Sequence, residues 1–188
     1  MKHFNDLILA SKSPRRKQLL AAAGFQFEVK TIEFEENFPA DMASTEVAEY
    51  LAVEKNKAHR EAFKTGTILT SDTVVIFNDR ILGKPNNAAE AFDVLKTLSG
   101  KIHLVMSGVC ISNSEKQVAF SSTTEVKFKD LTEDEISHYI EIASPMDKAG
   151  SYGIQEWIGM IGVEWIKGSF YNVVGLPVDK VYQALSAF

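Results

Sequence analysis

The chain has 188 residues, and its 20 Lys and Arg against 25 Asp and Glu give a formal net charge of −5. With 45% hydrophobic and 24% charged residues it has the composition of a soluble globular protein, which excludes a disordered or fibrous chain. The acidic balance argues against nucleic acid or a membrane surface as a partner, because binding to either needs a basic face. The length indicates one domain over residues 1–188 that buries its core without metal or disulfide staples.

Cysteine usage and hydropathy favour the cytoplasm. The lone Cys110 has no partner for an internal disulfide, and we expect no leader because no basic-then-apolar segment opens the chain. No apolar run approaches the roughly 20 residues of a membrane span. Cys110 lies in an apolar pattern typical of a small buried hydrophobe, and the four histidines share no metal-ligand spacing.

The first third of the chain predicts strand, helix, strand and helix. An apolar run over residues 7–10 predicts a strand, and Ser13 is a plausible N-cap for a helix that has Pro14 at its first position. Gly24 ends that helix, a strand follows over 25–32, and the acidic segment 33–39 is irregular. A long amphipathic helix is expected over 45–64, and its inward face comprises Val47, Tyr50, Leu51 and Ala58.

The rest of the chain alternates strands with helices. The predicted strands cover residues 68–70, 74–77, 81–82, 103–111, 118–128, 160–166 and 170–173. Asn87 with Glu90, and Thr132 with Glu135, predict helices that end near residues 98 and 142, and a last helix follows Pro177. Interleaved strands, hairpins and helices indicate an α/β fold, with a mixed sheet flanked by helices.

A first candidate site is the segment from Ser11 to Arg16, Ser-Lys-Ser-Pro-Arg-Arg, between a predicted strand and helix. The N–H groups of a helix N-terminus, two hydroxyls and the guanidiniums of Arg15 and Arg16 together suit a phosphate chain. The alternative is a capped surface helix with solvated arginines. The segment is not a P-loop, because no Gly-x-x-x-x-Gly-Lys occurs.

A second candidate is Ser71-Asp72-Thr73, which we expect at the end of a strand, where open α/β sheets bind ligands. Asp72 offers a carboxylate to a metal or to the proton of a water, and Thr73 offers a hydroxyl to a phosphate or sugar oxygen. The alternative is an ordinary turn, since Asp and Thr both favour turns.

Two charged segments are weaker candidates. Lys84 lies on a turn between Gly83 and Pro85, which would aim its ammonium at a phosphate; a solvated turn lysine is the alternative. The loop that contains Glu33, Glu35 and Glu36 carries the oxygen ligands that Mg²⁺ or Mn²⁺ prefers. A solvated acidic face is the alternative for that loop.

A late glycine-bearing loop, residues 149–155, ends in Gln155. The carboxamide of a glutamine matches both O4 and N3–H of uracil or thymine, so the loop suits recognition of a pyrimidine base. An exposed glutamine on a flexible loop is the alternative. Trp157 and Trp165 are expected to pack against the protein.

Taken together and in order, these segments resemble the Maf family of nucleoside triphosphate pyrophosphatases. The matching pieces cover residues 9–16, 35–36, 52–55, 71–75, 83–85, 149–155 and 174–177. The resemblance implies an α/β fold with two lobes around a cleft, similar to that of inosine triphosphate pyrophosphatases. It also implies hydrolysis of a nucleoside triphosphate to the monophosphate and pyrophosphate with a divalent cation, Mg²⁺ or Mn²⁺.

Within that family, Tyr-Gly-Ile-Gln over residues 152–155 resembles the branch that acts on dTTP and UTP. A pyrophosphatase for a purine or methylated nucleotide is one alternative. A nucleotide-binding regulator of cell division without turnover is another. The sequence also leaves the assembly open, with a homodimer among the alternatives.

The resemblance implies roles by position. Asp72 matches the proton acceptor, and the residues matching positions linked to substrate selection are Arg15, Thr73 and Gln155. The charged residues of the cleft are Glu36, Lys55 and Lys84, with the metal expected on Glu36 and Asp72. The family's acidic loop usually reads Asp-Val-Asp-Glu, so the carboxylate that meets the metal stays open here, and Glu156 stands where a glycine usually follows the glutamine.

Overall fold

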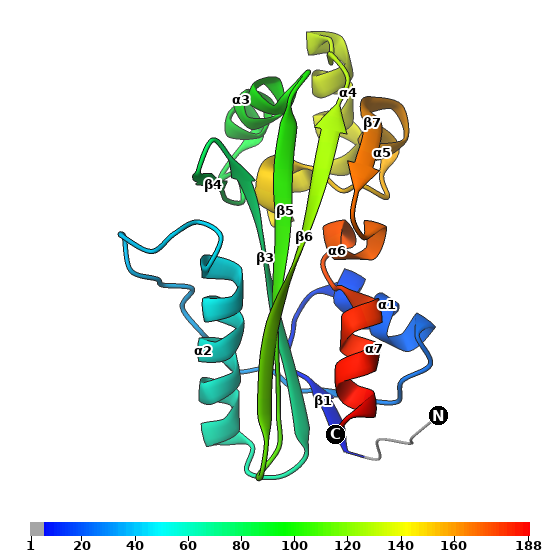
Figure 1. Cartoon of the computed structure of the whole chain (residues 1–188). Coiled ribbons are helices and arrows are strands. Elements are labelled where there is room, and N and C mark those ends of the chain that lie inside the picture. Colours follow the sequence, from blue (N-terminus) through cyan, green and yellow to red (C-terminus); the bar gives the residue numbers. More distant parts are fainter. Residues whose placement is uncertain (1–5) are drawn as a thin grey trace. The chain divides into compact units, whose positions relative to one another are not determined.

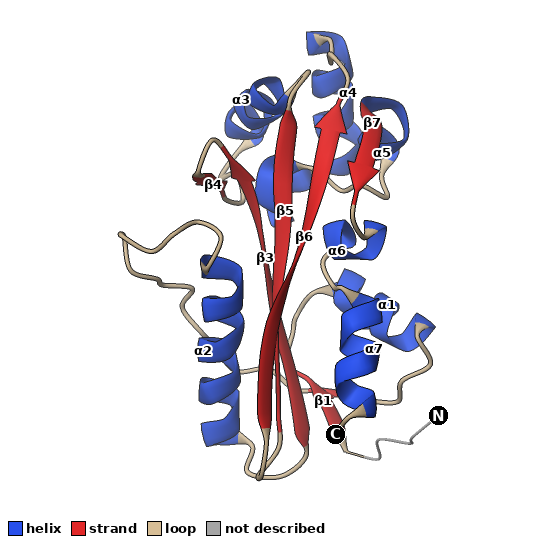
Figure 2. Ribbon diagram, viewed as in Figure 1, coloured by secondary structure: helices blue, strands red, loops and turns tan. Residues whose placement is uncertain are grey.

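The computed structural model describes residues 6–188 as strands and helices in alternation (Figures 1 and 2). The strands are β1 (Leu7–Leu9), β2 (Glu28–Val29), β3 (Thr67–Phe77), β4 (Arg80–Leu82), β5 (Ile102–Ser112), β6 (Gln117–Phe128) and β7 (Val163–Lys167). The α-helices are α1 (Pro14–Ala22), α2 (Val47–Ala62), α3 (Ala88–Leu98), α4 (Glu133–Ala143), α5 (Trp157–Gly162), α6 (Phe170–Val174) and α7 (Val178–Ser186). Two 3-10 turns, η1 (Pro145–Asp147) and η2 (Ala149–Ser151), follow α4.

The chain divides into two compact units. The first unit comprises the described residues up to Thr73 together with Ser107–Ser122 and Gly175–Phe188, and the second comprises Val74–Met106 and Thr123–Val174. Strands β3, β5 and β6 contribute residues to both. These units correspond to the two lobes that the family resemblance implies, while a cleft between the lobes stays a prediction.

In the first unit, successive side chains along a strand point to opposite faces of the sheet and so contribute to two separate apolar layers. β1 pairs in parallel with β2 and β3, and Figure 1 shows α2 on one side of the strands, with α1 and α7 on the other. Leu9 and Leu69 pack in a core with Leu20 of α1 and Leu185 of α7, whereas Ile68 belongs to a separate apolar cluster. Neighbouring residues of a strand therefore face opposite layers, as the period of two requires.

Helix α2 lies directly on the backbone of β5 within the first unit. A Cβ atom added at Gly108 would meet the carbonyl oxygen of Ala48 at 2.1 Å and Cα of Glu49 at 2.4 Å. No side chain fits in that space, so Gly108 is what allows this close approach of helix and strand.

The second unit carries the antiparallel part of the sheet. β3 turns into β4 through Asn78 and Asp79, whose φ angles of 50° and 60° make the tight hairpin expected from the sequence. β7 pairs antiparallel with β6. Helices α3 and α4 pack over a core with α5, which includes Leu95, Leu98, Phe128, Tyr139 and Ile158. With its parallel and antiparallel pairs, the predicted mixed sheet with flanking helices is confirmed.

Two strands differ in length from the prediction. The strand predicted over residues 25–32 is limited to Glu28–Val29, both of which are exposed. The break predicted at residues 71–73 does not exist, because β3 runs without interruption from Thr67 to Phe77. Asp72 and Thr73 do not end the strand, because their side chains have partners on α2 and α1, and the Thr70 hydroxyl beside them donates to the Ala52 carbonyl of α2 at 2.7 Å. The buried Ser71 hydroxyl has no hydrogen-bond partner among the described residues.

One predicted strand was wrong in type, and another was predicted to begin too early. The predicted strand at 170–173 is helix α6, whereas the strand predicted over 160–166 is present from Val163 as β7, and only residues 160–162 belong to α5. Their aromatic and β-branched residues favour strands, but tertiary contacts override that preference. Ser169 Oγ accepts from the Asn172 amide, and the buried Asn172 side chain donates to the Val105 carbonyl at 3.0 Å, which docks the short helix. Trp157 packs against the core of the second unit as expected, whereas Trp165 remains 39% exposed.

Candidate active site

The side chain of Asp72 meets a lysine and a second carboxylate in the first unit. Asp72 lies on β3, and Lys55 of α2 donates from Nζ both to Asp72 Oδ2 and, at 2.7 Å, to Glu36 Oε1. The Asp72 and Lys55 side chains are only 9% and 13% exposed. The other oxygen of Asp72 accepts from the Thr73 amide at 2.9 Å. One ammonium thus holds two carboxylates together, at a point where one of them is nearly shielded from water.

The acidic loop offers three glutamates, and their partners distinguish them. Glu33 pairs with exposed Lys12 at 2.7 Å, and the hydrogen bond from that lysine lowers the pKa of Glu33. Glu35 accepts from the side chain of its neighbour Asn37. Glu36 instead accepts a hydrogen bond from Lys55, which places it with Asp72. The structure therefore groups Glu36, rather than Glu33 or Glu35, with Asp72, and the carboxylate that meets a metal stays a prediction.

A second cluster surrounds Thr73. Arg16 of α1 donates from Nη2 to Thr73 Oγ1 at 3.0 Å and from Nε to the Gly175 carbonyl at 2.9 Å. Thr73 Oγ1 also shares a hydrogen bond of 2.8 Å with Ser107 Oγ of β5. The Ser11 hydroxyl lies 3.5 Å from Arg16 Nη1. Through these hydrogen bonds the guanidinium of Arg16 connects three parts of the chain: the segment just after β1, strand β3, and the segment before α7.

Electrostatics explain how Arg16 stays in that position. Burial lowers the pKa of Arg16, while the nearby charges of Asp72 and Glu36 raise it and Arg15 lowers it. A guanidinium keeps its proton under any physiological condition, so Arg16 carries a fixed positive charge close to both carboxylates.

Asp72 and Thr73 are adjacent in sequence but serve different faces of β3. Asp72 contacts Lys55 of α2, whereas Thr73 contacts Arg16 of α1. The expectation that they follow a strand end was wrong, and the alternation of a continuous strand explains their separation. The turn alternative is excluded as well.

The second unit holds the other two predicted residues. Lys84 follows Gly83, whose carbonyl accepts from the Gly150 amide at 3.2 Å, so the lysine turn and the glycine-bearing loop are neighbours. The side chains of Lys84 and Gln155 are both exposed. Their grouping with Asp72 stays a prediction.

Sequence reasoning missed two contributors to the cluster around Thr73. Ser107 lies between apolar residues in the middle of β5, and Gly175 acts through its carbonyl oxygen. The small pair Ser107-Gly108 inside an apolar run was a usable signal of a close approach. Nothing in the sequence marks a carbonyl as an arginine acceptor.

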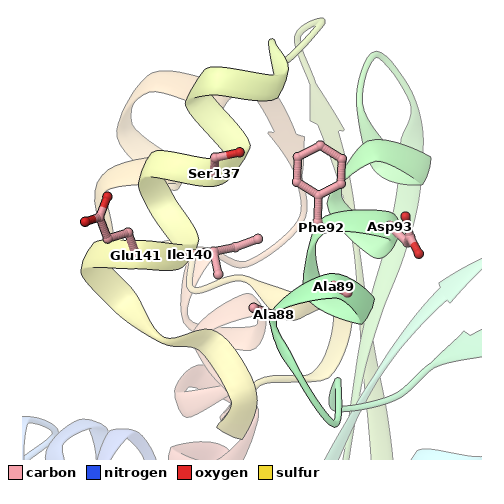
Figure 3. A pocket seen from close by; sticks show the side chains of 7 residues that line it. All are labelled: Ala88, Ala89, Phe92, Asp93, Ser137, Ile140 and Glu141. Carbon is pink, nitrogen blue, oxygen red and sulfur yellow. The ribbon is translucent and has the colours of Figure 1, made fainter.

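Within the second unit, a pocket of about 470 Å³ lies between α3 and α4 (Figure 3). It is lined by Ala88, Ala89, Phe92, Asp93, Ser137, Ile140 and Glu141. None of the predicted site residues lines it, so the pocket does not coincide with the chemistry described above.

Several titratable residues are structural. Cys110 is fully buried as expected, and burial raises the pKa of its thiol to about 12. His59 accepts from the Ile32 amide and lies 2.7 Å from the Lys55 carbonyl, which fastens the chain before the acidic loop to α2. Among residues 6–188, no three His, Cys, Asp or Glu side chains lie together in a group that could hold a metal ion by itself.

Comparison with known proteins decides the family. The Maf-like protein family matches residues 6–188. The chain belongs to the Maf-like family. Two relatives of this Maf-like protein carry the name dTTP/UTP pyrophosphatase. One, from Bacteroides thetaiotaomicron, is 46% identical over 96% of the chain and 94% of its own length. The other, from Phocaeicola vulgatus, is 48% identical over 95% of the chain and 94% of its own length.

A protein outside these relatives has a similar fold. A solved structure of a HAM1 protein from Coxiella burnetii aligns with a TM-score of 0.55 over 97% of the Maf-like chain and 98% of its own, at 14% identity. That likeness concerns the fold alone. In the part of the chain that the structure describes, no helix is both long enough and apolar enough to cross a bilayer.

Proposed function

We propose that this Maf-like protein hydrolyses dTTP and UTP to the nucleoside monophosphate and pyrophosphate. The observation that carries the proposal is the convergence of Glu36, Lys55 and Asp72 beside the fixed charge of Arg16. Relatives that align over nearly their whole length and bear the name dTTP/UTP pyrophosphatase support the choice of reaction and substrate.

In this proposal Asp72 orients the attacking water and accepts its proton. Oδ1 of Asp72 is held by the Thr73 amide and Oδ2 by Lys55, so the carboxylate has a defined direction. Attack at the α-phosphorus releases pyrophosphate, and transfer of a phosphoryl group depends mainly on positioning and charge neutralisation. Lys55, Arg15 and Lys84 supply cations for the triphosphate oxygens, while the partly buried Arg16 holds Thr73 in place.

The residues fit a divalent cation. Oxygens of Glu36 and Asp72 converge on one nitrogen of Lys55, and one or two carboxylates plus substrate phosphates are the usual protein contribution to a Mg²⁺ site. Glu36 and Asp72 would hold the ion together with the triphosphate. When bound, Mg²⁺ or Mn²⁺ would neutralise phosphate charge and acidify water, and this help is needed because carboxylates are weak bases at neutral pH.

Selection of the base is assigned to Gln155. Its exposed carboxamide offers one acceptor and two donors, which match N3–H and O4 of uracil or thymine. The proposed substrates are cytoplasmic metabolites, so we place the reaction in the cytoplasm. A homodimer stays a prediction that sedimentation would measure.

The test is turnover of purified protein with Mg²⁺ or Mn²⁺ and a panel of dTTP, UTP, CTP, GTP, ATP and methylated nucleotides. Pyrophosphate from dTTP and UTP is expected, and Asp72→Asn should lower kcat by roughly 10²–10⁴-fold with the fold retained. The exposed Asp93→Asn is the matched control and should keep wild-type turnover. Binding without turnover of any nucleotide, or a folded Asp72→Asn with normal kcat, would overturn the proposal.

A further inference from the structure

The loop that presents Gln155 is anchored on its N-terminal side. Tyr152 and Ile154 are each only 6% exposed, whereas Gln155 between Ile154 and Glu156 points to solvent. The Tyr152 hydroxyl lies 2.7 Å from His103 Nε2, and its ring packs edge-on against Phe128 with centroids 4.9 Å apart. The backbone before Gln155 is therefore fixed in the core of the second unit.

One phenol on α4 ties both sides of Gln155 together. Tyr139 Oη accepts from the Gly153 amide at 3.0 Å and donates to Glu156 Oε2 at 2.5 Å. Burial and the bond to Glu156 raise the pKa of Tyr139, so the phenol stays protonated and keeps donating in that direction. Because Gly153 and Glu156 flank Gln155, a single buried hydroxyl restrains the loop on either side of the exposed amide.

The carboxylate of Glu156 has a second partner. It lies 3.2 Å from Nζ of Lys148, a lysine that is only 7% exposed and also pairs with Asp147 at 2.7 Å. A Cβ atom at Gly153 would lie 2.6 Å from Glu156 Cδ, so the carboxylate fills the space next to the loop backbone. Charge-assisted hydrogen bonds of this kind are stronger than neutral ones.

Orientation matters for Gln155 because its amide has two faces of opposite hydrogen-bonding character. Rotation of the carboxamide by half a turn exchanges its donor and its acceptor. One orientation matches O4 and N3–H of uracil, and the other matches the amino group and N3 of cytosine. A loop that leaves the place of the amide against the base edge undefined would therefore accept both pyrimidines.

We propose that Tyr139, Glu156 and Lys148 form a positioning cluster that holds the Gln155 loop in the arrangement that selects uracil and thymine over cytosine. The selectivity part rests on the proposed function, whereas the anchoring of the loop does not. None of the three residues needs to touch the substrate. Their effect reaches the base through the backbone of residues 153–156.

The experiment compares Tyr139→Phe with the wild type. The ring stays and only the hydroxyl is lost, so the kcat/KM ratio of UTP to CTP should fall by at least about tenfold, the effect of losing about 1.4 kcal/mol of discrimination. Hydrogen exchange at the backbone amides of residues 153–156 should accelerate by a similar factor. Tyr171→Phe on α6, where the phenol is 54% exposed, is the matched control and should change neither quantity.

A second pair of variants guards against misfolding of Tyr139→Phe. Glu156→Ala removes the acceptor for the phenol and should lower the kcat/KM ratio of UTP to CTP. Glu156→Gln keeps an acceptor and should retain most of that ratio. Equal loss of kcat/KM for UTP and CTP, or unchanged amide exchange, would overturn the positioning cluster. A wild type without turnover would overturn the proposed function, and amide exchange alone would then decide the anchoring.

Discussion

Replacing Lys55 by methionine tests the ion pair at the centre of the site. The Lys55→Met side chain keeps similar length but removes the ammonium, so buried Asp72 keeps the hydrogen bond from the Thr73 amide and the nearby charge of Arg16. Breaking a buried pair by removing one partner costs about 3–5 kcal/mol. The side chains retain 9% and 13% exposure and Arg16 stays nearby, so we expect the lower end, about 3 kcal/mol.

The expected loss is large enough for a melting experiment. For a chain of 188 residues, about 3 kcal/mol corresponds to a decrease in Tm of roughly 6–12 °C. The double variant Lys55→Met with Asp72→Asn should recover part of this loss, because a neutral amide needs no counter-charge. Lys57→Met, on the same helix but in an exposed pair with Glu54, is the control and should melt like the wild type.

Two results would refute this reasoning. A Lys55→Met protein that melts within about 2 °C of the wild type would mean that Asp72 is well solvated or satisfied by other groups. A double variant whose loss equals the sum of the two single losses would mean that Lys55 and Asp72 do not interact energetically.

Three further predictions concern selectivity, acid stability and thiol reactivity. Gln155→Ala should reduce kcat/KM for dTTP and UTP more than for ATP and GTP, and an equal loss across the panel would show that Gln155 only shapes its loop. Burial lowers the pKa of His103 to about 4, so the unfolded chain binds a proton between pH 6.5 and 4 that the folded protein does not. The free energy of unfolding should therefore decrease as the pH falls from 6.5 to 4. The decrease that His103 causes is at most about 1.4 kcal/mol per pH unit. Urea unfolding at pH 7 and pH 5 should show a smaller difference for His103→Asn than for the wild type; an identical difference would contradict the assignment. Because burial raises the pKa of Cys110 to about 12, iodoacetamide at pH 8 should label it in urea but not in the native protein, and mass spectrometry would detect native labelling that contradicts this.

Local signals predicted the helix boundaries well. The side chains of Ser13, Asn87 and Thr132 each accept the backbone amide three residues ahead, and Thr132 forms a full capping box with Glu135. Such contacts lie inside one turn of chain, so a short stretch of sequence contains both partners.

The polar segment of β3 shows where sequence reasoning stops. Thr70, Asp72 and Thr73 look like the end of a strand, yet each side chain has a partner on a helix that is 17 or more positions away. A window of neighbouring residues contains none of those partners. For the same reason the sequence indicated the charged residues of the site but not which glutamate reaches Lys55, nor that Arg16 holds Thr73.

The segment after Gly175 has a consequence for synthesis of the protein. Leu176, Val181 and Leu185 complete the same core as Leu7 and Leu9, and the Gly175 carbonyl holds Arg16. A ribosome adds about 5–20 residues per second from the N-terminus, so β1 and α1 wait for residues 176–185 before their core closes. The cluster around Thr73 is therefore completed only after Gly175 has been synthesised, and a nascent chain that stops before α7 lacks part of the core behind that cluster.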